Sequence, residues 1–147
     1  MSLTIHSVAP GDDLAAICAQ MTAKAWGADN EMTDYDADEL RRYLASGTNL
    51  LLLAYSGEKI AGVAVAREHL HPAGDHTLYV DELDTHPDLR RQGIATALMH
   101  ELFAIARARG LKELWVGTEQ DNHPADAFYR SLRLKEVQAS NIYNYNV

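Results

Sequence analysis

Two periodicities divide the chain into strands and helices. Alternating apolar and polar residues, or brief apolar runs, predict strands at Leu3–Val8, Leu50–Tyr55, Ile60–Ala66 and Thr77–Thr85. The second and third of these flank Ser56-Gly57-Glu58-Lys59, which is typical of a hairpin turn. The first half of the chain is therefore predicted to be rich in β-strands, and its second and third strands are predicted to form an antiparallel hairpin.

Apolar residues three or four positions apart predict helices around these strands. Asp12 or Asp13 can cap a first helix, and Asp36 can cap a second that runs through Leu44 and ends at Gly47. We expect further helices at Arg90–Arg109 and Ala125–Leu132.

The remaining segments complete an α+β pattern. Glu113–Thr118 is predicted to be a strand, and Lys135–Val147 ends in the strand-like residues Ile142, Tyr143 and Tyr145. The chain has no internal repeat, and its 147 residues suit one domain spanning 1–147. We predict an α+β fold around a mixed β-sheet.

A strand, a turn and a glycine-containing helix start follow one another in the middle of the chain. The strand Thr77–Thr85 leads through His86–Leu89 to Arg90-Arg91-Gln92-Gly93-Ile94-Ala95. The first N–H groups of a helix have no intrahelical partner, and the helix dipole adds positive charge there. Because Gly93 permits close approach and two arginines add donors, this segment suits a pyrophosphate. An ordinary solvated helix start is the alternative.

Two motifs carry a resemblance to a known family. Arg90-x-x-Gly93-x-Ala95 after a strand resembles the acyl-CoA pyrophosphate loop of the GNAT family of N-acetyltransferases, and Asn122-His-Pro-Ala125-Asp-Ala-Phe-Tyr129-Arg-Ser-Leu132 resembles a second block of that family. The tract from Arg90 to Leu98 looks most like the aminoglycoside 3-N-acetyltransferase branch. One departure is Arg133, where the family usually has glycine.

The resemblance implies a fold, a reaction and a set of binding residues. It implies a central mixed sheet flanked by about four helices, with acetyl-CoA as co-substrate and a primary amine as acceptor. The pantetheine arm would lie beside the end of the strand, and the pyrophosphate at the helix start. The implied cofactor-binding residues are Leu83, Asp84, Thr85, Arg90, Arg91, Gln92, Gly93, Ile94, Ala95, Thr96 and Asn122.

Acetyl transfer to an amine needs a base and a proton donor. Glu82 is our first candidate for the base because it immediately precedes the residues expected beside the acyl group; Asp84 and Glu119 are the rivals. A regular pleat would put Asp81 on the opposite face from Glu82. Tyr129 can donate a proton to the leaving thiolate, and its alternative role is packing in the core.

Charge favours one class of acceptor and disfavours another class of partner. The formal net charge is −8, which argues against nucleic acid and favours cationic small molecules. The acids are concentrated in two stretches. They either keep the protein soluble or line a cleft that attracts a polyamine. The members are Asp29, Glu31, Asp34, Asp36, Asp38 and Glu39 in the first stretch and Asp75, Asp81, Glu82 and Asp84 in the second.

Other classes of function have less support. The single cysteine, Cys18, excludes an internal disulfide, and no apolar stretch reaches the ~18 residues of a membrane span. We expect a cytoplasmic protein that binds no metal, with His69, His71 and His76 as solvated loop residues. Trp26 and Trp115 are assigned to the core rather than to a stacking platform.

Three functions follow from these observations. The first is an N-acetyltransferase acting on a small cationic amine, possible examples being aminoglycosides. The second keeps the fold and acetylates a peptide or a polyamine. The third is an acyl-CoA-binding module without turnover, which is disfavoured because the chain keeps both Tyr129 and the carboxylates. A homodimer is compatible with each.

Overall fold

The computed structural model describes residues 2–27, 32–134 and 137–147. The chain divides into two compact units, Met1–Val116 and Gly117–Val147. The predicted acid cluster of the first half includes Asp29 and Glu31, which lie outside the described residues. The extent of the domain, 1–147, stays a prediction.

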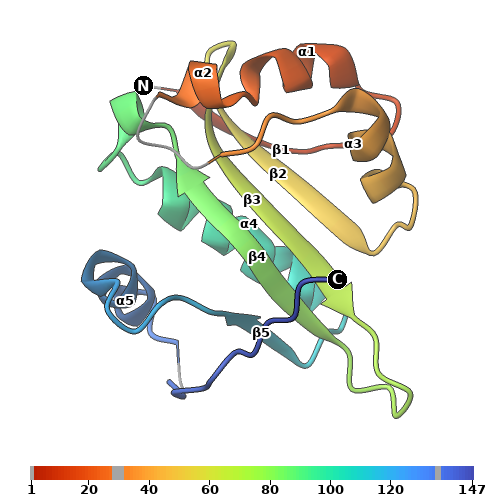
Figure 1. The fold of residues 1–147 in the computed structure, drawn as a ribbon, viewed down its shortest axis with the longest axis vertical. Coiled ribbons are helices and arrows are strands. Elements are labelled where there is room, and N and C mark those ends of the chain that lie inside the picture. Colours follow the sequence, from red (N-terminus) through yellow and green to blue (C-terminus); the bar gives the residue numbers. More distant parts are fainter. Residues whose placement is uncertain (1, 28–31, 135–136) are drawn as a thin grey trace. The chain divides into compact units, whose positions relative to one another are not determined.

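Four antiparallel strands form most of the sheet in the first unit (Figure 1). They are β1 (Leu3–Ser7), β2 (Asn49–Ser56), β3 (Lys59–His69) and β4 (Thr77–Thr85), and they pair in chain order. A fifth strand, β5 (Glu113–Val116), pairs in parallel with β4. The sheet is therefore mixed, and the predicted α+β fold class is confirmed.

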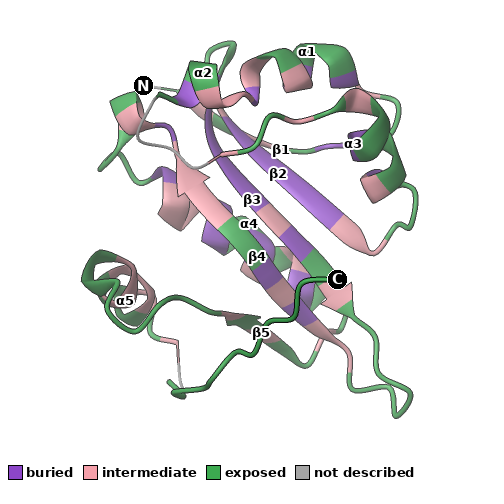
Figure 2. Ribbon diagram, in the orientation of Figure 1, coloured by how far each residue is buried: buried purple, intermediate pink, exposed green. Residues whose placement is uncertain are grey.

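Three helices cover one face of this sheet. They are α1 (Leu14–Gln20), α2 (Ala23–Trp26) and α3 (Ala37–Leu44). Asp13 and Asp36 cap α1 and α3 as predicted, because their carboxylates accept the N–H groups of Ala16 and Glu39. The short helix α2 was not predicted, since four residues are too few to show a helical period. Leucines of β2, including Leu51 and Leu53, pack beneath these helices, and Figure 2 shows this strand as mostly buried.

The opposite face is covered by α4 (Ile94–Ala108), which lies behind the sheet in Figure 1. Leu98, Met99 and Leu102 of this helix are fully buried. Gly62 of β3 permits the close packing: a Cβ atom at that position would lie 2.5 Å from Ile94 Cγ2 and 3.1 Å from Leu98 Cδ1. The start of α4 is thereby held against β3.

The second unit contains α5 (His123–Ser131), close to the predicted helix. The expected strand at the C-terminus is wrong for residues 137–147, which form no strand. Ile142, Tyr143 and Tyr145 are 91%, 90% and 86% exposed. Their sequence favours extended backbone, but a strand also needs a paired neighbour, which a local pattern cannot supply. None of the described helices is both long and apolar enough to span a membrane.

Candidate active site

The segment between β4 and α4 forms a loop with two left-handed residues. A short 3₁₀ helix, η1 (Pro87–Leu89), replaces the predicted plain turn, and Arg90 after it is extended. Arg91 has φ 62° and Gly93 has φ 77°. Left-handed and right-handed residues in succession turn backbone N–H groups toward a common centre, which suits an anion.

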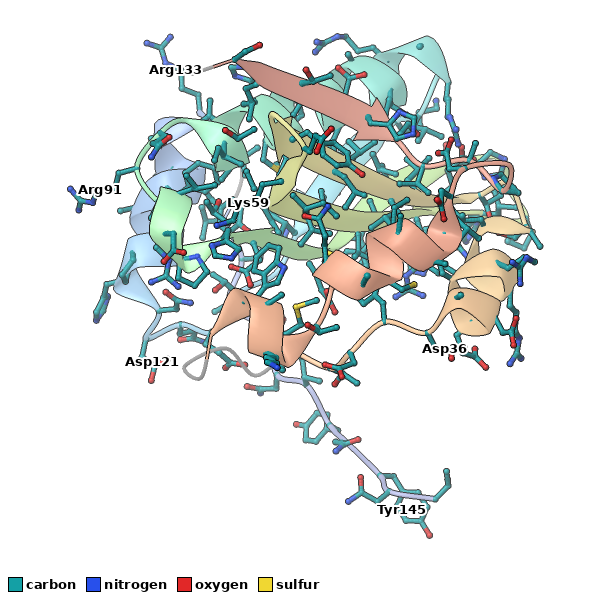
Figure 3. The ribbon with its side chains drawn as sticks, turned by 90° about the horizontal axis from the view of Figure 1, so that it is seen from above. Asp36, Lys59, Arg91, Asp121, Arg133 and Tyr145 are labelled. Atoms are coloured by element: carbon teal, nitrogen blue, oxygen red, sulfur yellow. The ribbon has the colours of Figure 1, made fainter. Side chains whose placement is uncertain are left out.

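The start of α4 has no side-chain cap. Gly93 occupies the N-cap position, and no side chain accepts a hydrogen bond from the first turn. α4 therefore begins at Ile94, four residues later than predicted, because the loop uses Arg90 to Gly93. The side chains of Arg90 and Arg91 are exposed, and Figure 3 shows Arg91 extending away from the ribbon. The predicted pyrophosphate-binding residues, from Arg90 to Thr96, are thus contiguous at this helix start.

His86 is buried, and the sequence did not indicate that it has a structural role. It is 6% exposed, and its ring lies 5.3 Å from that of Trp26. Its Nε2 is 2.9 Å from the carbonyl oxygen of Ala25, and its Nδ1 accepts the N–H of Asp88 at 3.2 Å. The neutral tautomer with its proton on Nε2 satisfies both contacts. His86 therefore ties α2 to the beginning of the loop; Pro87 immediately after it was the available signal for a cap.

The end of β4 presents different side chains on its two faces. Val65 of β3 pairs with Glu82, and Val63 pairs with Asp84. Since paired residues share a face and Val63 belongs to the core beneath α1 and α3, Glu82 and Asp84 project to that side. Leu83 and Thr85 pair with Ala64 and Gly62, on the α4 side. The predicted base and the predicted cofactor contacts Leu83 and Thr85 therefore alternate along one strand.

A β-bulge corrects the prediction for Asp81. Val65 pairs with Glu82, but the next residue of β3, Ala66, pairs with Val80, so Asp81 is an extra residue in β4. The carboxylate of Asp81 lies 3.2 Å from Nε of Arg67, which is on the same face as Val65. The pleat is thus irregular, and Asp81 shares its face with Glu82 rather than pointing away from it.

The acids beside the bulge perturb one another. The pKa of Glu82 is raised, first by partial burial and then by the negative charges of Asp81 and Asp84. The pKa of Tyr35, in the segment before α3, is also raised, first by burial and then by the charge of Glu82. Tyr35 therefore lies within electrostatic range of the candidate base and stays protonated.

Tyr43 of α3 supports the same region. Its hydroxyl lies 2.9 Å from the carbonyl oxygen of Ala66, beside the bulge, and 3.0 Å from that of Leu50. Burial, followed by the charge of Asp81, raises the pKa of Tyr43 to about 12, so it remains a donor at neutral pH. Tyr43 lies within the predicted second helix, but nothing in the local sequence indicated its hydrogen bond to β3.

The second unit holds the other two predicted site residues. Asn122 is the N-cap of α5, and its Oδ1 accepts the N–H of Ala125 at 3.1 Å. Tyr129 lies on α5 with its ring 5.2 Å from that of Phe128, and burial raises its pKa. Glu119, the rival base, precedes this helix. Arg133 has φ 60°, so the position at which the family usually has glycine keeps a left-handed backbone.

The predictions for the tryptophans and for the loop histidines have definite outcomes. Trp26 is 1% exposed and belongs to the core as expected, but Trp115 is 40% exposed, so its assignment to the core is wrong. β5 is an edge strand, which leaves Trp115 without a covering helix among the described residues of the first unit. His71 and His76 accept backbone N–H groups within their turn, but His69 is the last residue of β3 and pairs with Thr77, so its assignment to the loop is wrong. No group of three potential metal ligands occurs in the part of the chain that the structure describes.

The chain matches one family over most of its length. Residues 17–132, which include the loop at Gly93 and the block around Tyr129, match the Acetyltransferase (GNAT) family. The chain belongs to this family. Its mixed sheet and its glycine-capped α4 are therefore features of an acetyltransferase fold.

Sequence identity to an individual relative is low. N-alpha-acetyltransferase 30 of Schizosaccharomyces pombe is 28% identical over 93 residues, which is 63% of this chain and 61% of that protein. The match thus spans about three fifths of the relative's length.

Solved structures share the fold. An aminoglycoside acetyltransferase from an uncultured soil metagenomic sample, in complex with sisomicin, has a TM-score of 0.85 at 18% identity, covering 99% of this chain and 96% of that one. AAC(6')-Iy in complex with the bisubstrate analog CoA-S-monomethyl-acetylneamine has a TM-score of 0.79 at 15% identity, with both chains covered fully (100%).

Proposed function

We propose that this protein transfers an acetyl group from acetyl-CoA to a primary amine of a small cationic acceptor. The observation that carries the proposal is the start of α4. This 15-residue helix begins after the left-handed Gly93, which has no side-chain cap, and the exposed Arg90 and Arg91 shortly precede that glycine. Because the chain belongs to the GNAT family, we interpret this helix start as the binding site for the pyrophosphate of acetyl-CoA.

Acetyl-CoA would be bound by backbone N–H groups of the protein more than by its side chains. The N–H groups from Gln92 to Ala95 would bind the pyrophosphate, assisted by Arg90, Arg91 and Thr96. The parallel ladder between β4 and β5 ends at Val80, whereas β4 continues to Thr85. This offset supports a pantetheine arm that follows β4 at Leu83, Asp84 and Thr85, with Asn122 donating from its side-chain amide.

Glu82 would act as the general base. A lysine-like amine has a pKa of ~10.4 and is mostly charged at neutral pH, so transfer requires the removal of a proton. The raised pKa of Glu82 makes its carboxylate a stronger base than an ordinary glutamate. Once the amine has lost its proton to Glu82, its lone pair attacks the thioester carbon and the carbon–sulfur bond breaks.

Tyr129 would complete the reaction as the acid. Its hydroxyl donates a proton to the thiolate sulfur that leaves. The phenolate then takes the remaining extra proton of the acetylated nitrogen, directly or through water, and Glu82 releases its own proton to solvent. Burial raises the pKa of Tyr129, which keeps it in the protonated form that the role needs. Asp84 and Glu119 are the alternative bases in this scheme.

The acceptor would be a polycation. The net charge of −8 and the acids Asp81, Glu82 and Asp84 on one face of β4 favour a positively charged amine. One of the similar structures is of an aminoglycoside acetyltransferase in complex with sisomicin. The relative named N-alpha-acetyltransferase 30 supports a second candidate, a peptide N-terminal amine.

A panel of amines separates these acceptors. Release of the CoA thiol would be followed with aminoglycosides, spermidine, peptides with free N-termini and acidic amino acids. We expect aminoglycosides or spermidine to react best, with an apparent affinity that weakens as salt rises from 0.1 M to 1 M. Preference for peptides would favour the second candidate. Tight binding of acetyl-CoA without acetylation of any amine would indicate a binding module.

The cofactor loop has its own test. Gly93→Glu places a negative side chain at the proposed pyrophosphate site, and calorimetry should show the loss of acetyl-CoA binding. Gly47→Glu is the matched control, since Gly47 also has a positive φ, 73°, and open space around it. Equal binding by the two variants would show that the loop is not the pyrophosphate site.

A further inference from the structure

Three aromatic side chains form a cluster on the sheet outside the residues assigned above. His69, Tyr79 and Trp115 come from β3, β4 and β5, and we refer to them as the aromatic platform. The Tyr79 and Trp115 ring centroids are 4.1 Å apart, and that of His69 lies 6.3 Å from Tyr79 and 5.8 Å from Trp115. Trp115 is 40% exposed, and its Nε1 donates to Thr77 Oγ1 at 3.2 Å, which fixes the indole. An exposed ring held in one orientation is ready to contact a ligand.

The platform shares its face with the candidate base. Tyr79 pairs with Arg67 on one side and with Trp115 on the other, while Val65, two residues before Arg67, pairs with Glu82. Side chains two apart on a strand lie on the same face, so the platform and Glu82 face the same way. Because Asp81 is the extra residue of the bulge, Tyr79 and Glu82 are as far apart as their partners Arg67 and Val65, which corresponds to about 7 Å at ~3.3 Å per residue.

The platform already holds one cation. The guanidinium carbon of Arg67 lies 5.3 Å from the centroid of Tyr79, in the geometry of a cation–π contact. The same group pairs with Asp81, so its charge is matched within the protein. Glu113 lies two residues before Trp115 on β5 and is exposed on this face. The surroundings of the exposed indole therefore attract a further positive charge.

We propose that the aromatic platform binds a second cationic group of the acceptor, on the same face of the sheet as the amine that is acetylated. The inference rests on the proposed function and assigns a binding site to the second positive charge of its polycationic acceptor. The distal ammonium would sit over the face of Trp115, because a tryptophan ring attracts cations more strongly than any other side-chain ring. The platform would thereby contribute to acceptor affinity and would leave acetyl-CoA binding to the loop at Gly93.

Steady-state kinetics with two acceptors test the platform. Sisomicin supplies several ammonium groups, and glucosamine supplies one. Trp115→Ala should raise KM for sisomicin about 3- to 30-fold more than KM for glucosamine, which is the range expected for a lost cation–π contact. Trp115→Phe keeps an aromatic face and should retain most of the preference. Leu70→Ala, which removes another exposed apolar side chain, is the control and should change neither KM.

The outcomes separate this inference from the proposed function. An equal rise in both KM values, or in neither, with Trp115→Ala would overturn the platform while the acetyltransferase activity stands. If the parent protein acetylates no amine, the proposed function fails, and fluorescence decides the platform alone. Sisomicin should then quench the emission that the parent has and Trp115→Phe lacks, since Trp26 is buried. The absence of that quenching would overturn the inference.

Discussion

Arg67 Nε lies 3.2 Å from Asp81 Oδ2, on the face of the sheet that carries Glu82. The pair exists because the bulge in β4 turns Asp81 toward β3 instead of toward α4. It places one positive charge between the aromatic platform and the acids. Arg67 is therefore the ion-pair partner of one of the two carboxylates that raise the pKa of Glu82.

Removal of Arg67 should make Glu82 a weaker acid. In Arg67→Met the charge of Asp81 is no longer matched, so the pKa of Glu82 rises further. Glu82 must be ionised to accept a proton, and the acidic limb of the profile of kcat/KM against pH should therefore move to higher pH. Arg109→Met is the control, because Arg109 pairs with Glu68 on the α4 face of the sheet. A limb that moves equally in both variants would indicate a general charge effect.

Glu82→Gln should slow the enzyme and stabilise the fold. Loss of a general base typically costs about 10²–10⁴-fold in rate. Because the folded-state pKa of Glu82 is raised, its ionised form costs folding free energy at neutral pH; that cost declines as pH falls through the folded pKa and is gone below the ordinary pKa of the unfolded chain. The melting temperature of Glu82→Gln should therefore exceed that of the parent at pH 7 but match it in acid.

The rival bases provide the comparison for this variant. Asp84→Asn and Glu119→Gln remove the same charge at the two alternative positions. If either of them lowers kcat by the expected factor while Glu82→Gln retains full activity, the base is misassigned. The stability result is independent of this outcome, because it depends only on the environment of Glu82.

The sequence predicted those parts of the fold that depend on interactions between residues close together in the chain, such as helix caps and strand bounds. The caps Asp13 and Asp36 and the bounds Thr77–Thr85 follow from capping chemistry and from residue alternation, and the structure has all three. The glycine-containing start of α4 was recognisable for the same reason, since the left-handed N-cap needs a residue such as Gly93.

The parts that failed depend on partners far away in sequence. The bulge at Asp81 arises from the register of β4 against β3, which no pattern within β4 encodes. The exposure of Trp115 follows from the edge position of β5, and the burial of His86 follows from its contact with α2. Tyr43 was placed on the correct helix, but its bond to Ala66 required the assembled sheet.

Gly62→Ala should weaken both the fold and the cofactor site. The new Cβ would lie 2.5 Å from Ile94 Cγ2 and 3.3 Å from the carbonyl oxygen of Asp84, so the start of α4 must move. Overpacking of this kind costs about 1–3 kcal/mol in unfolding free energy. Since Ile94 begins α4 and lies within the proposed pyrophosphate site, calorimetry should also show weaker acetyl-CoA binding. Gly11→Ala, with no atom within 4 Å, should change neither quantity.

Tyr129→Phe should lower turnover and leave acetyl-CoA affinity nearly unchanged. Only the hydroxyl is lost, and a general acid typically contributes about 10²–10⁴-fold to the rate. Tyr143→Phe is the control, since it removes the hydroxyl of a side chain that is 90% exposed. An unchanged kcat with the best acceptor would mean that Tyr129 packs α5 and does not donate the proton.

Arg133→Gly should stabilise the protein. Arg133 keeps a left-handed backbone, φ 60°, after α5, and its N–H donates to the carbonyl of Arg130 at 3.0 Å. A side chain in this conformation costs roughly 1–2 kcal/mol in folding free energy. Glycine removes this cost, but its greater freedom in the unfolded chain cancels part of the gain. We expect a gain of about 1 kcal/mol, or a rise of roughly 2–4 °C in melting temperature. Arg133→Ala separates strain from charge: it removes the same charge but keeps a Cβ, so it should give no such gain. Equal stabilisation by Ala and Gly would show that the charge of Arg133, and not its backbone conformation, is the unfavourable feature of this turn.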